Sequence, residues 1–446
     1  MLTEADAVAQ PSGAFKRRVA LVHAPYQRIF ITLRSPAWDG PDVQYAFALV
    51  PALLNCVGSR CKALRKVIET ASSTGAPLRA ILSQDECTAG NVLATDARQK
   101  VTLLYLSFAE YGDALASEKA WMPVTCLSRG QMDAARGGIA SVTCDWLREW
   151  HRQQLMTPFE VLGHTVRVEL ALWVSDAEAI RQTFDAKGAS GLRPCFLCAN
   201  CISRHSDADS RDSSLHSICQ ADFASFVPAN HIEMIDLMTD SMAKLPLMTS
   251  ATLALRERCI GLRISQHNLW SCAISRNLMR LELVMYDSMH CYYSQGIASQ
   301  ELLLFYKKVH AATGIELHEL ASLAEQAAWR RSQSQQRHGK TASWLRRLFR
   351  PKLWQGDVLK CSASETQAMV PLMRWFAVVL GWTNIAELRP ACRSLLLLGT
   401  CGDVLRRVHA TKRFQLLTSV QSQHHECFQL AYGTNCVRPK HHFRLH

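Results

Sequence analysis

Two stretches of the chain decide its fold class: residues 78–85 (LRAILSQD) and 165–176 (TVRVELALWVSD). Each is a short apolar run that ends at an aspartate, which is typical of a buried β-strand at the point where it leaves its sheet. Between them lie two further apolar runs, 101–108 and 121–127, and a helical pattern that opens at Gly137 and Gly138. The order strand, strand, strand, helix, strand predicts an α/β fold with a mixed sheet.

The two aspartates, Asp85 and Asp176, are the first candidate site. Carboxylates at the ends of adjacent strands lie close enough to share divalent cations, and hard oxygen ligands suit Mg²⁺ or Mn²⁺. A pair of such ions can activate an attacking oxygen and stabilise a leaving one. The alternative is that each aspartate only starts a turn, which is a common role of this residue.

Composition limits the class of protein. The chain has 446 residues, of which 48% are hydrophobic and 20% charged, so it is long enough for several domains with cores of their own. This excludes a disordered chain, a collagen and a coiled coil. No apolar run approaches the roughly 18 residues of a membrane span, and the N-terminal residues lack an apolar signal core. We therefore expect a soluble nuclear or cytoplasmic protein that is neither secreted nor bound to a membrane.

Charge points to a polyanionic partner. Fifty Lys and Arg against 38 Asp and Glu give a net charge of +12. Residues 330–352 hold eight basic side chains and no acid, interleaved with Trp344 and Phe349 and followed by Trp354. Such a segment can neutralise phosphates and stack on bases, although a solvated linker has the same composition. The basic residues are Arg330, Arg331, Arg337, Lys340, Arg346, Arg347, Arg350 and Lys352.

The 17 cysteines include a candidate zinc site. Cys195-x2-Cys198 is followed, after 17 residues, by His216-x2-Cys219, and two such pairs have the spacing of a closed structural Zn²⁺ site. Cys201 and His205 are competing ligands for the second pair. The alternative is a set of free buried thiols. We prefer zinc, because this polar segment is too short to fold around a core of its own.

The remaining sequence is expected to be mainly helical. We divide the chain into an N-terminal helical region (1–76), the first part of the sheet domain (77–186), the zinc-binding insertion (187–230), a helical insertion with the basic segment (231–356) and a C-terminal helical region (357–446). In the first region, Tyr45, Phe47 and Leu54 are expected on one helical face. In the helical insertion, Asp287 and His290 have the i, i+3 spacing that places them on one face of a helix.

The order of these motifs resembles RNase H-like DDE/D transposases of the CACTA, KDZ and Plavaka-like group, and transposon-derived proteins related to them. The resemblance rests on LRAILSQDECTAGNVL, KVTLLYLSFAEYG, VELALWVSDAEA, KGASGLRPCFLCANC, YDSMH, CSASETQAMVPLM and the terminal PKHHFRLH, which together span about residues 45–446. It implies an RNase H-like mixed sheet that is interrupted by the zinc module and the helical insertion. It also implies DNA as partner and metal-dependent cleavage and strand transfer at phosphodiester bonds.

The resemblance assigns roles to individual residues. Asp85 and Asp176 become the first two acids of the triad, and Asp287 with His290 matches the [C/D]-x2-H motif of these transposases. Glu365 is the candidate third acid. Relatives that carry this terminal segment usually continue into a further acidic motif, whereas this sequence stops at His446. Either Glu365 completes the triad, or the protein is a truncated remnant that cannot cut DNA. The other reading is a non-enzymatic, zinc-stapled DNA-binding protein; a homo-oligomer is left open in both.

Overall fold

The computed structural model describes residues 29–88, 100–203, 212–326, 346–406 and 414–446. The chain divides into two compact units. The first consists of Met1–Lys187 and Ala229–Met285, and the second of Gly188–Pro228 and Tyr286–His446. Each unit is therefore built from two separate segments of the sequence. Within the described ranges, no helix has both the length and the apolar character needed to cross a membrane.

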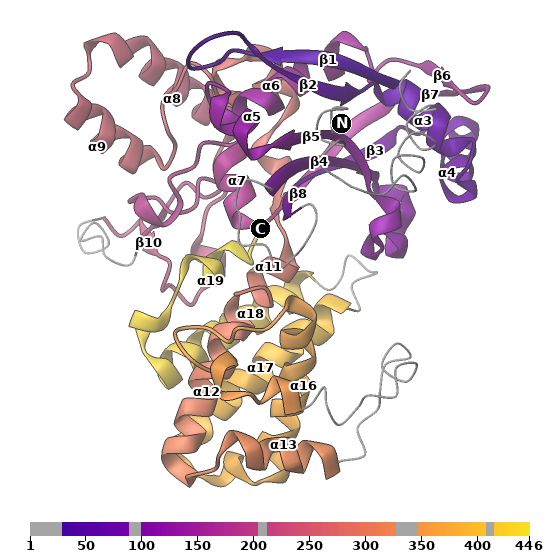
Figure 1. Cartoon of the computed structure of the whole chain (residues 1–446). Helices are drawn as coiled ribbons and strands as arrows, with labels where there is room; N and C mark the ends of the chain where they lie inside the picture. Colours follow the sequence, from indigo (N-terminus) through magenta and orange to yellow (C-terminus); the bar gives the residue numbers. More distant parts are fainter. Residues whose placement is uncertain (1–28, 89–99, 204–211, 327–345, 407–413) are drawn as a thin grey trace. The chain divides into compact units, whose positions relative to one another are not determined.

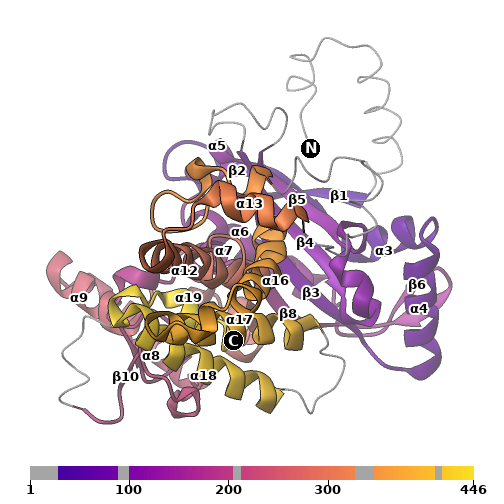
Figure 2. The same ribbon diagram turned by 90° about the horizontal axis from the view of Figure 1, so that it is seen from below.

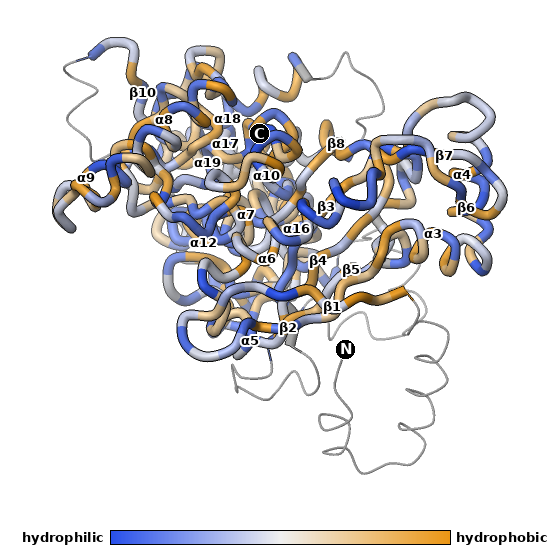
Figure 3. Tube along the Cα trace, turned by 90° about the horizontal axis from the view of Figure 1, so that it is seen from above, coloured by the Kyte–Doolittle hydropathy of each residue, from blue (hydrophilic) through white to orange (hydrophobic). Residues whose placement is uncertain are grey.

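A seven-stranded mixed sheet forms the centre of the first unit, with the strand order β1-β2-β5-β4-β3-β8-β11 (Figure 1). Its strands are β1 (Phe30–Ser35), β2 (Val43–Ala48), β3 (Leu78–Thr88), β4 (Lys100–Phe108), β5 (Met122–Ser128), β8 (Val168–Ser175) and β11 (Val284–Tyr286). The four strands expected from the sequence are thus confirmed. Apolar residues follow one another along β4 and β5, as the hydropathy colouring shows (Figure 3).

The strands at the centre of the sheet form both parallel and antiparallel pairs. β3 is antiparallel to β4 and parallel to β8. The chain between β5 and β8 contains α5 (Arg129–Ala134), α6 (Gly138–Arg152) and the hairpin of β6 (Phe159–Val161) with β7 (His164–Val166). A helical crossover of this kind is what two parallel neighbours require. The mixed α/β class predicted from the sequence is therefore confirmed.

Aromatic side chains fill the core between the sheet and α6. The Trp146 ring lies 5.7 Å from Trp150, 6.2 Å from Phe47 on β2 and 6.4 Å from Trp173 on β8. Trp173 in turn contacts Phe184, which follows α7 (Ala177–Thr183). Offset and edge-on ring contacts of this kind add to the free energy gained from burial. They fix α6 against β2 and against β8, the strand that leads into Asp176.

The structure differs from the prediction near the N-terminus. Residues 43–48, which include Tyr45 and Phe47, form strand β2, and the first described helix, α3 (Val50–Gly58), begins only after it. Val43, Tyr45 and Phe47 are buried at every second position, which is the period of a strand. The same residues also fit a helical face over this short distance, so the pattern alone was ambiguous. α4 (Lys62–Thr74) follows α3.

A short helical segment completes the first unit. It contains α8 (His231–Lys244), α9 (Ser250–Ile260) and α10 (Ala273–Leu278), and α10 packs against α6. Gly137, just before α6, has a φ of +89°, and a Cβ atom there would lie 2.4 Å from the carbonyl oxygen of His267. Glycine is therefore required at this close approach between α6 and the loop before α10.

The second unit is mostly helical. Its helices are α11 (Ser288–Tyr292), α12 (Ile297–Thr313), α13 (Leu317–Gln326), α16 (Ala363–Val379), α17 (Arg389–Arg406), α18 (Phe414–Tyr432) and α19 (Pro439–Phe443). α12 packs against both α16 and α17, and α17 packs along α18 (Figure 2). Residues 188–228 contribute only short elements, among them the two-residue strands β9 (Cys201–Ile202) and β10 (His216–Ser217). The helices predicted for the C-terminal part of the sequence are confirmed.

Candidate functional site

The two aspartates lie at corresponding points of adjacent parallel strands in the first unit. β3 and β8 are paired in register up to Leu82 and Trp173. Three residues further along each strand come Asp85 and Asp176. Between these points, the backbone N–H of Gln84 donates to Ser175 Oγ at 2.8 Å, which shows that the strands stay together to this level. β3 continues to Thr88, so Asp85 lies inside its strand and not at the end that was predicted, whereas Asp176 directly follows β8. The pairing of β3 with β8 nevertheless brings the two aspartates to the same level of the sheet, which we name the acidic edge.

The two faces of the sheet differ at this edge. Gln84 is buried, and its Oε1 accepts a hydrogen bond from Thr183 of α7 at 2.5 Å, so it faces the helices. Side chains alternate along a strand, so Asp85 is directed to the opposite face, where it is exposed. Asp176 is half-buried, and its Oδ1 accepts the N–H of Ala179 at 2.6 Å as the N-cap of α7. One oxygen of Asp176 is thus committed to the helix cap.

A pocket of about 470 Å³ opens on the helical face of the same sheet. Glu86, Arg129, Arg181 and Asp185 are among the residues that line it, whereas Asp85 and Asp176 are not. Burial raises the pKa of Asp185 to about 6, although the nearby Arg263 acts in the opposite direction. Within the pocket, Arg129 forms ion pairs with Glu86 and Asp133. The pocket is therefore separate from the acidic edge.

Glu365, the candidate third acid, belongs to the second unit. It is the third residue of α16 and forms a capping box with Ser362: each side chain accepts the other's backbone N–H. It also forms an ion pair with Arg347. These contacts lower the pKa of the Glu365 carboxyl although burial acts to raise it. In the ranges that the structure describes, no third acidic ligand joins Asp85 and Asp176 in a metal-binding group.

Asp287 and His290 form a hydrogen-bonded pair at the start of α11. Asp287 caps the helix by accepting the N–H of Met289 at 2.9 Å, and its Oδ2 lies 2.5 Å from His290 Nδ1. Burial raises the pKa of Asp287, but the hydrogen bonds from His290 and Met289 outweigh it and the pKa is lowered. The structure thus brings together the two residues of this predicted motif.

The described part of the basic segment is engaged within the protein. Arg346 forms a bidentate ion pair with Glu325, and Arg347 pairs with Glu365. Phe349 and Trp354 are buried, and their rings stack at 6.0 Å with an angle of 8° between them. They are core residues and do not offer faces to nucleic-acid bases, contrary to the expectation from sequence. Arg350 and Lys352 are exposed. The other predicted contacts, Arg330, Arg331, Arg337, Lys340 and Trp344, lie outside the described residues.

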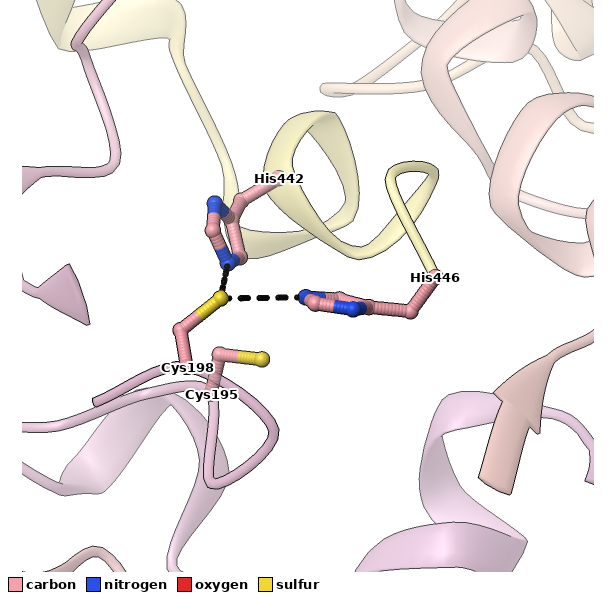
Figure 4. Close-up of side chains that lie close together, drawn as sticks. All are labelled: Cys195, Cys198, His442 and His446. Carbon is pink, nitrogen blue, oxygen red and sulfur yellow. Dashed lines mark hydrogen bonds between the residues drawn. The ribbon is translucent and has the colours of Figure 1, made fainter. Parts of the chain in front are cut away.

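The clearest metal-binding group of the described residues is in the second unit. One ligand atom from each of Cys195, Cys198, His442 and His446 lies within 4.8 Å of all the others (Figure 4). Cys198 Sγ is 3.3 Å from His442 Nε2 and 3.2 Å from His446 Nε2. Two thiolates and two imidazoles are a common ligand set for Zn²⁺. These four residues, which we name the Cys/His cluster, could hold a zinc ion.

Short backbone pairings position the two cysteines. The loop that carries them is held by a bridge between Cys198 and Pro228 and by the pairing of β9 with β10. Asn200 ties the same loop together: its Nδ2 donates to the carbonyl of Ser225 at 2.9 Å, and its Oδ1 accepts the N–H of Val227. Because both ends of the loop are fixed, the two sulfurs face the same point.

The histidines are positioned by α19 and the turn after it. Lys440 Nζ donates to the carbonyls of His290, Ser294 and Gln295 at 3.0–3.2 Å. Phe443 stacks on Tyr286 with ring centroids 4.4 Å apart. These contacts anchor the residues on both sides of His442.

A buried polar network holds the turn between the two histidines. Arg444 donates to His424 Nδ1 at 2.8 Å, and His424 Nε2 lies 2.7 Å from Glu301 Oε2. Glu301 and His424 have no exposed surface, and Arg444 is 8% exposed. Arg444 also donates to the carbonyl of Gln421. A buried charge is tolerated when it is paired in this way, and the pairing fixes the backbone of the turn.

The electrostatics of the Cys/His cluster favour a thiolate. Burial acts to raise the pKa of Cys195, but the Cys198 thiol and the imidazoles of His446 and His442 lower it well below its ordinary value. Zn²⁺ binds cysteine as the thiolate, so a lowered pKa of Cys195 suits metal binding at this point.

The structure brings together only two of the four predicted zinc ligands. Cys195 and Cys198 are in the cluster as predicted, but His216 and Cys219 are not part of it. His216 packs edge-on against Phe226, and Cys219 Sγ lies 3.8 Å from the carbonyl of Thr434. Cys201 is buried in β9, and His205 lies outside the described residues. Spacing along the sequence favoured His216 and Cys219 as the second pair of ligands because they lie close to Cys198. In the fold, the second pair comes from the C-terminal turn, far away in the sequence.

Sequence reasoning did not select His442 or His446 as a zinc ligand. The available signal was their i, i+4 spacing in PKHHFRLH, which places two imidazoles one helical turn apart. A scan against protein-family models and a search of curated proteins both find no match to this chain.

Proposed function

We propose that the protein is a transposase-like DNA-processing protein with an RNase H-like core, in which Asp85 and Asp176 bind Mg²⁺. One observation carries the proposal: two aspartates at corresponding positions of adjacent parallel strands, in a sheet of the order β5-β4-β3-β8. This order, with α6 before β8, is the strand-strand-strand-helix-strand arrangement that the resemblance implies. The net charge of +12 supports a nucleic-acid partner.

The residues at the edge fit a divalent cation in part. Asp85 is exposed on a rigid strand, and Asp176 has one oxygen that the helix cap does not use. When bound, Mg²⁺ would polarise a phosphodiester and lower the pKa of an attacking water. In this proposal Asp85 and Asp176 hold the ion and the sheet fixes the distance between their carboxylates. The exposed face gives a DNA backbone access to them.

A nicking assay with the full chain tests the proposal. The substrate is supercoiled plasmid with Mg²⁺, and the readout is the fraction converted to nicked circles. We expect conversion by the wild type and a loss to background in Asp85→Asn and Asp176→Asn. Glu86→Gln is the matched control, because Glu86 is the next carboxylate on β3 but is directed to the other face. Equal nicking by the wild type and the Asp85→Asn variant would refute the assignment.

A second candidate function is DNA binding without cleavage. It is favoured by the Cys/His cluster and by the lack, in the described residues, of a third acid in a metal-binding group with the aspartates. Glu365 is used in its own capping box. In this reading zinc staples a basic protein that binds the DNA backbone.

The salt dependence of binding separates the two candidates from a protein with no nucleic-acid role. Either candidate predicts that affinity for duplex DNA falls steeply between about 50 and 200 mM salt, because bound cations are released from the DNA. The DNA-binding reading further predicts no Mg²⁺-dependent nicking. Absence of binding at low salt would contradict both.

A further inference from the structure

Five basic side chains lie on one exposed surface of the second unit. They come from the C-terminal half of α12 and from the segment 350–360, which contains η11 (Pro351–Leu353) and precedes α16. All five side chains are exposed. We name this group the α12 basic surface; it consists of Lys307, Lys308, Arg350, Lys352 and Lys360.

The segment 350–360 is folded against α12. Trp354 is buried, and its ring contacts that of Tyr306 edge-on, with 5.1 Å between the ring centroids. The N–H of Leu359, which is also buried, donates to the carbonyl of Ser299 at 2.9 Å. Because both contacts lie inside the second unit, they fix the position of the segment on the helix.

Further contacts bring the cations together. Lys307 Nζ donates to the carbonyl oxygen of Gly356 at 3.2 Å, and a Cβ atom on Gly356 would lie 4.0 Å from Lys360 Cε. The N–H of Lys360 donates at 2.8 Å to the carbonyl of Leu353, the next residue after Lys352. Lys307, Lys352 and Lys360 therefore surround the same turn of the chain.

The acids of this region are paired with other cations. Asp357, within the segment, forms an ion pair with Arg438 at 3.6 Å, and Glu365 pairs with Arg347. Among the residues that the structure describes, no such ion pair joins the α12 basic surface to an acid. Like charges that are held side by side repel one another, so the surface lowers the stability of the unit unless an anion lies on it.

We propose that the α12 basic surface binds the phosphate backbone of duplex DNA without reading its sequence. This inference rests on the proposed function, in which DNA is the partner. Four of the five cations are lysines, which contact phosphates as compact point charges on flexible stems. Phe349 and Trp354 are buried, so they are not available to stack on the bases of a single strand. Contacts to the backbone alone position a duplex but carry no sequence information.

A salt titration of duplex DNA binding by the full-length protein tests the proposal. Each phosphate contact steepens the fall of log affinity with log salt by about 0.9, so five contacts contribute a slope of about −4.5. The triple variant Lys308→Gln/Lys352→Gln/Lys360→Gln should lower this steepness by about 2.7. Its affinity at about 100 mM salt should fall more than about tenfold, and equally for unrelated duplex sequences. Thermal unfolding should show no loss of stability, because these side chains are exposed.

The matched control removes the same charge from the first unit. It is Lys62→Gln/Lys66→Gln/Lys119→Gln, at three exposed lysines, and its slope should equal that of the wild type. Equal slopes for the wild type and the α12 variant, or equal losses in the α12 variant and the control, would overturn the proposal and leave DNA binding in place. Absence of duplex binding by the wild type at low salt would overturn the proposed function as well. Tighter binding of polyglutamate than of DNA would also overturn the proposal, because the surface would then fit an acidic protein.

Discussion

The two candidate metal centres differ in how their ligands are held. Asp85 and Asp176 lie on neighbouring strands, so the sheet of the first unit positions them whether or not an ion is bound. The Cys/His cluster of the second unit joins a short loop to the C-terminal turn, and its ligands come from elements with little regular structure. We therefore propose that an ion at the first centre would add chemistry to a site the sheet already holds, whereas an ion at the second would contribute to folding.

The largest effect should follow loss of zinc from the Cys/His cluster. Structural Zn²⁺ contributes apparent free energies of about 10–16 kcal/mol in small zinc domains, so Cys195→Ser or a strong chelator should unfold residues 188–228. Hydrogen exchange of peptides from this segment measures the effect. Cys219→Ser is the matched control, because Cys219 lies in the same segment but outside the cluster. If Cys219→Ser were as damaging as Cys195→Ser, the ligand assignment would fail.

The buried network behind the cluster should give the next largest effect. Arg444→Met leaves Glu301 and His424 buried without their cation, and breaking a buried pair costs about 3–5 kcal/mol. Urea unfolding of the second unit measures the loss. Arg438→Met removes an exposed ion pair with Asp357 and should cost less than about 1 kcal/mol. Equal losses in the two variants would show that the network does not stabilise the turn.

Acid should destabilise the second unit through His425. Burial, with Arg444 nearby, lowers the pKa of His425 from 6.5 to about 2, and both ring nitrogens are buried with no hydrogen-bond partner among the described atoms. The unfolded chain therefore takes up a proton below pH 6.5 that the folded chain does not. The contribution of His425 to the free energy of unfolding is therefore undiminished above pH 6.5. Below pH 6.5 the free energy of unfolding falls by about 1.4 kcal/mol per pH unit, until the pH approaches 2.

The variant His425→Phe isolates this effect from the other histidines. Phenylalanine keeps an aromatic ring beside Phe223, which His425 contacts at 5.2 Å. The difference in unfolding free energy between variant and wild type should grow by about 2 kcal/mol from pH 6.5 to 4.5. A difference that stays constant with pH would mean that His425 is protonated in the folded protein.

The smallest effect separates the two roles of Asp176. Asp176→Ala removes the N-cap of α7 and should cost about 1 kcal/mol, whereas Asp176→Asn keeps a capping oxygen and should cost little. Both variants remove the carboxylate that would hold Mg²⁺. Thermal unfolding should therefore distinguish them, while a Mg²⁺-binding assay should not. Retained Mg²⁺ binding in Asp176→Asn would show that the carboxylate serves only as a cap.

The sheet was predictable because its signal is local. Apolar runs that end at Asp85 and Asp176 reveal buried strands without knowledge of their neighbours. Residues 43–48 were assigned to the wrong element, because Tyr45 and Phe47 satisfy the period of a helix as well as that of a strand over six residues. Only the partner strands β1 and β5 decide between them.

The metal cluster was half predictable for the same reason. Cys195 and Cys198 form a local knuckle that spacing reveals. His442 and His446 reach it only through the fold of the second unit, so a search for a nearby pair selected His216 and Cys219 instead. Phe349 and Trp354 were taken for exposed aromatics because their neighbours are basic, and only tertiary packing shows that they are buried.

Iron-directed cleavage tests most directly whether Asp85 and Asp176 share a divalent cation. Fe²⁺ in place of Mg²⁺, with ascorbate and peroxide, cuts the backbone near bound metal, and fragment mass spectrometry locates the cuts. We predict cuts near the ends of β3 and β8 that Mg²⁺ suppresses and that are absent from Asp85→Asn. Cuts that persist in Asp85→Asn, or that occur only beside the Cys/His cluster, would contradict the acidic centre.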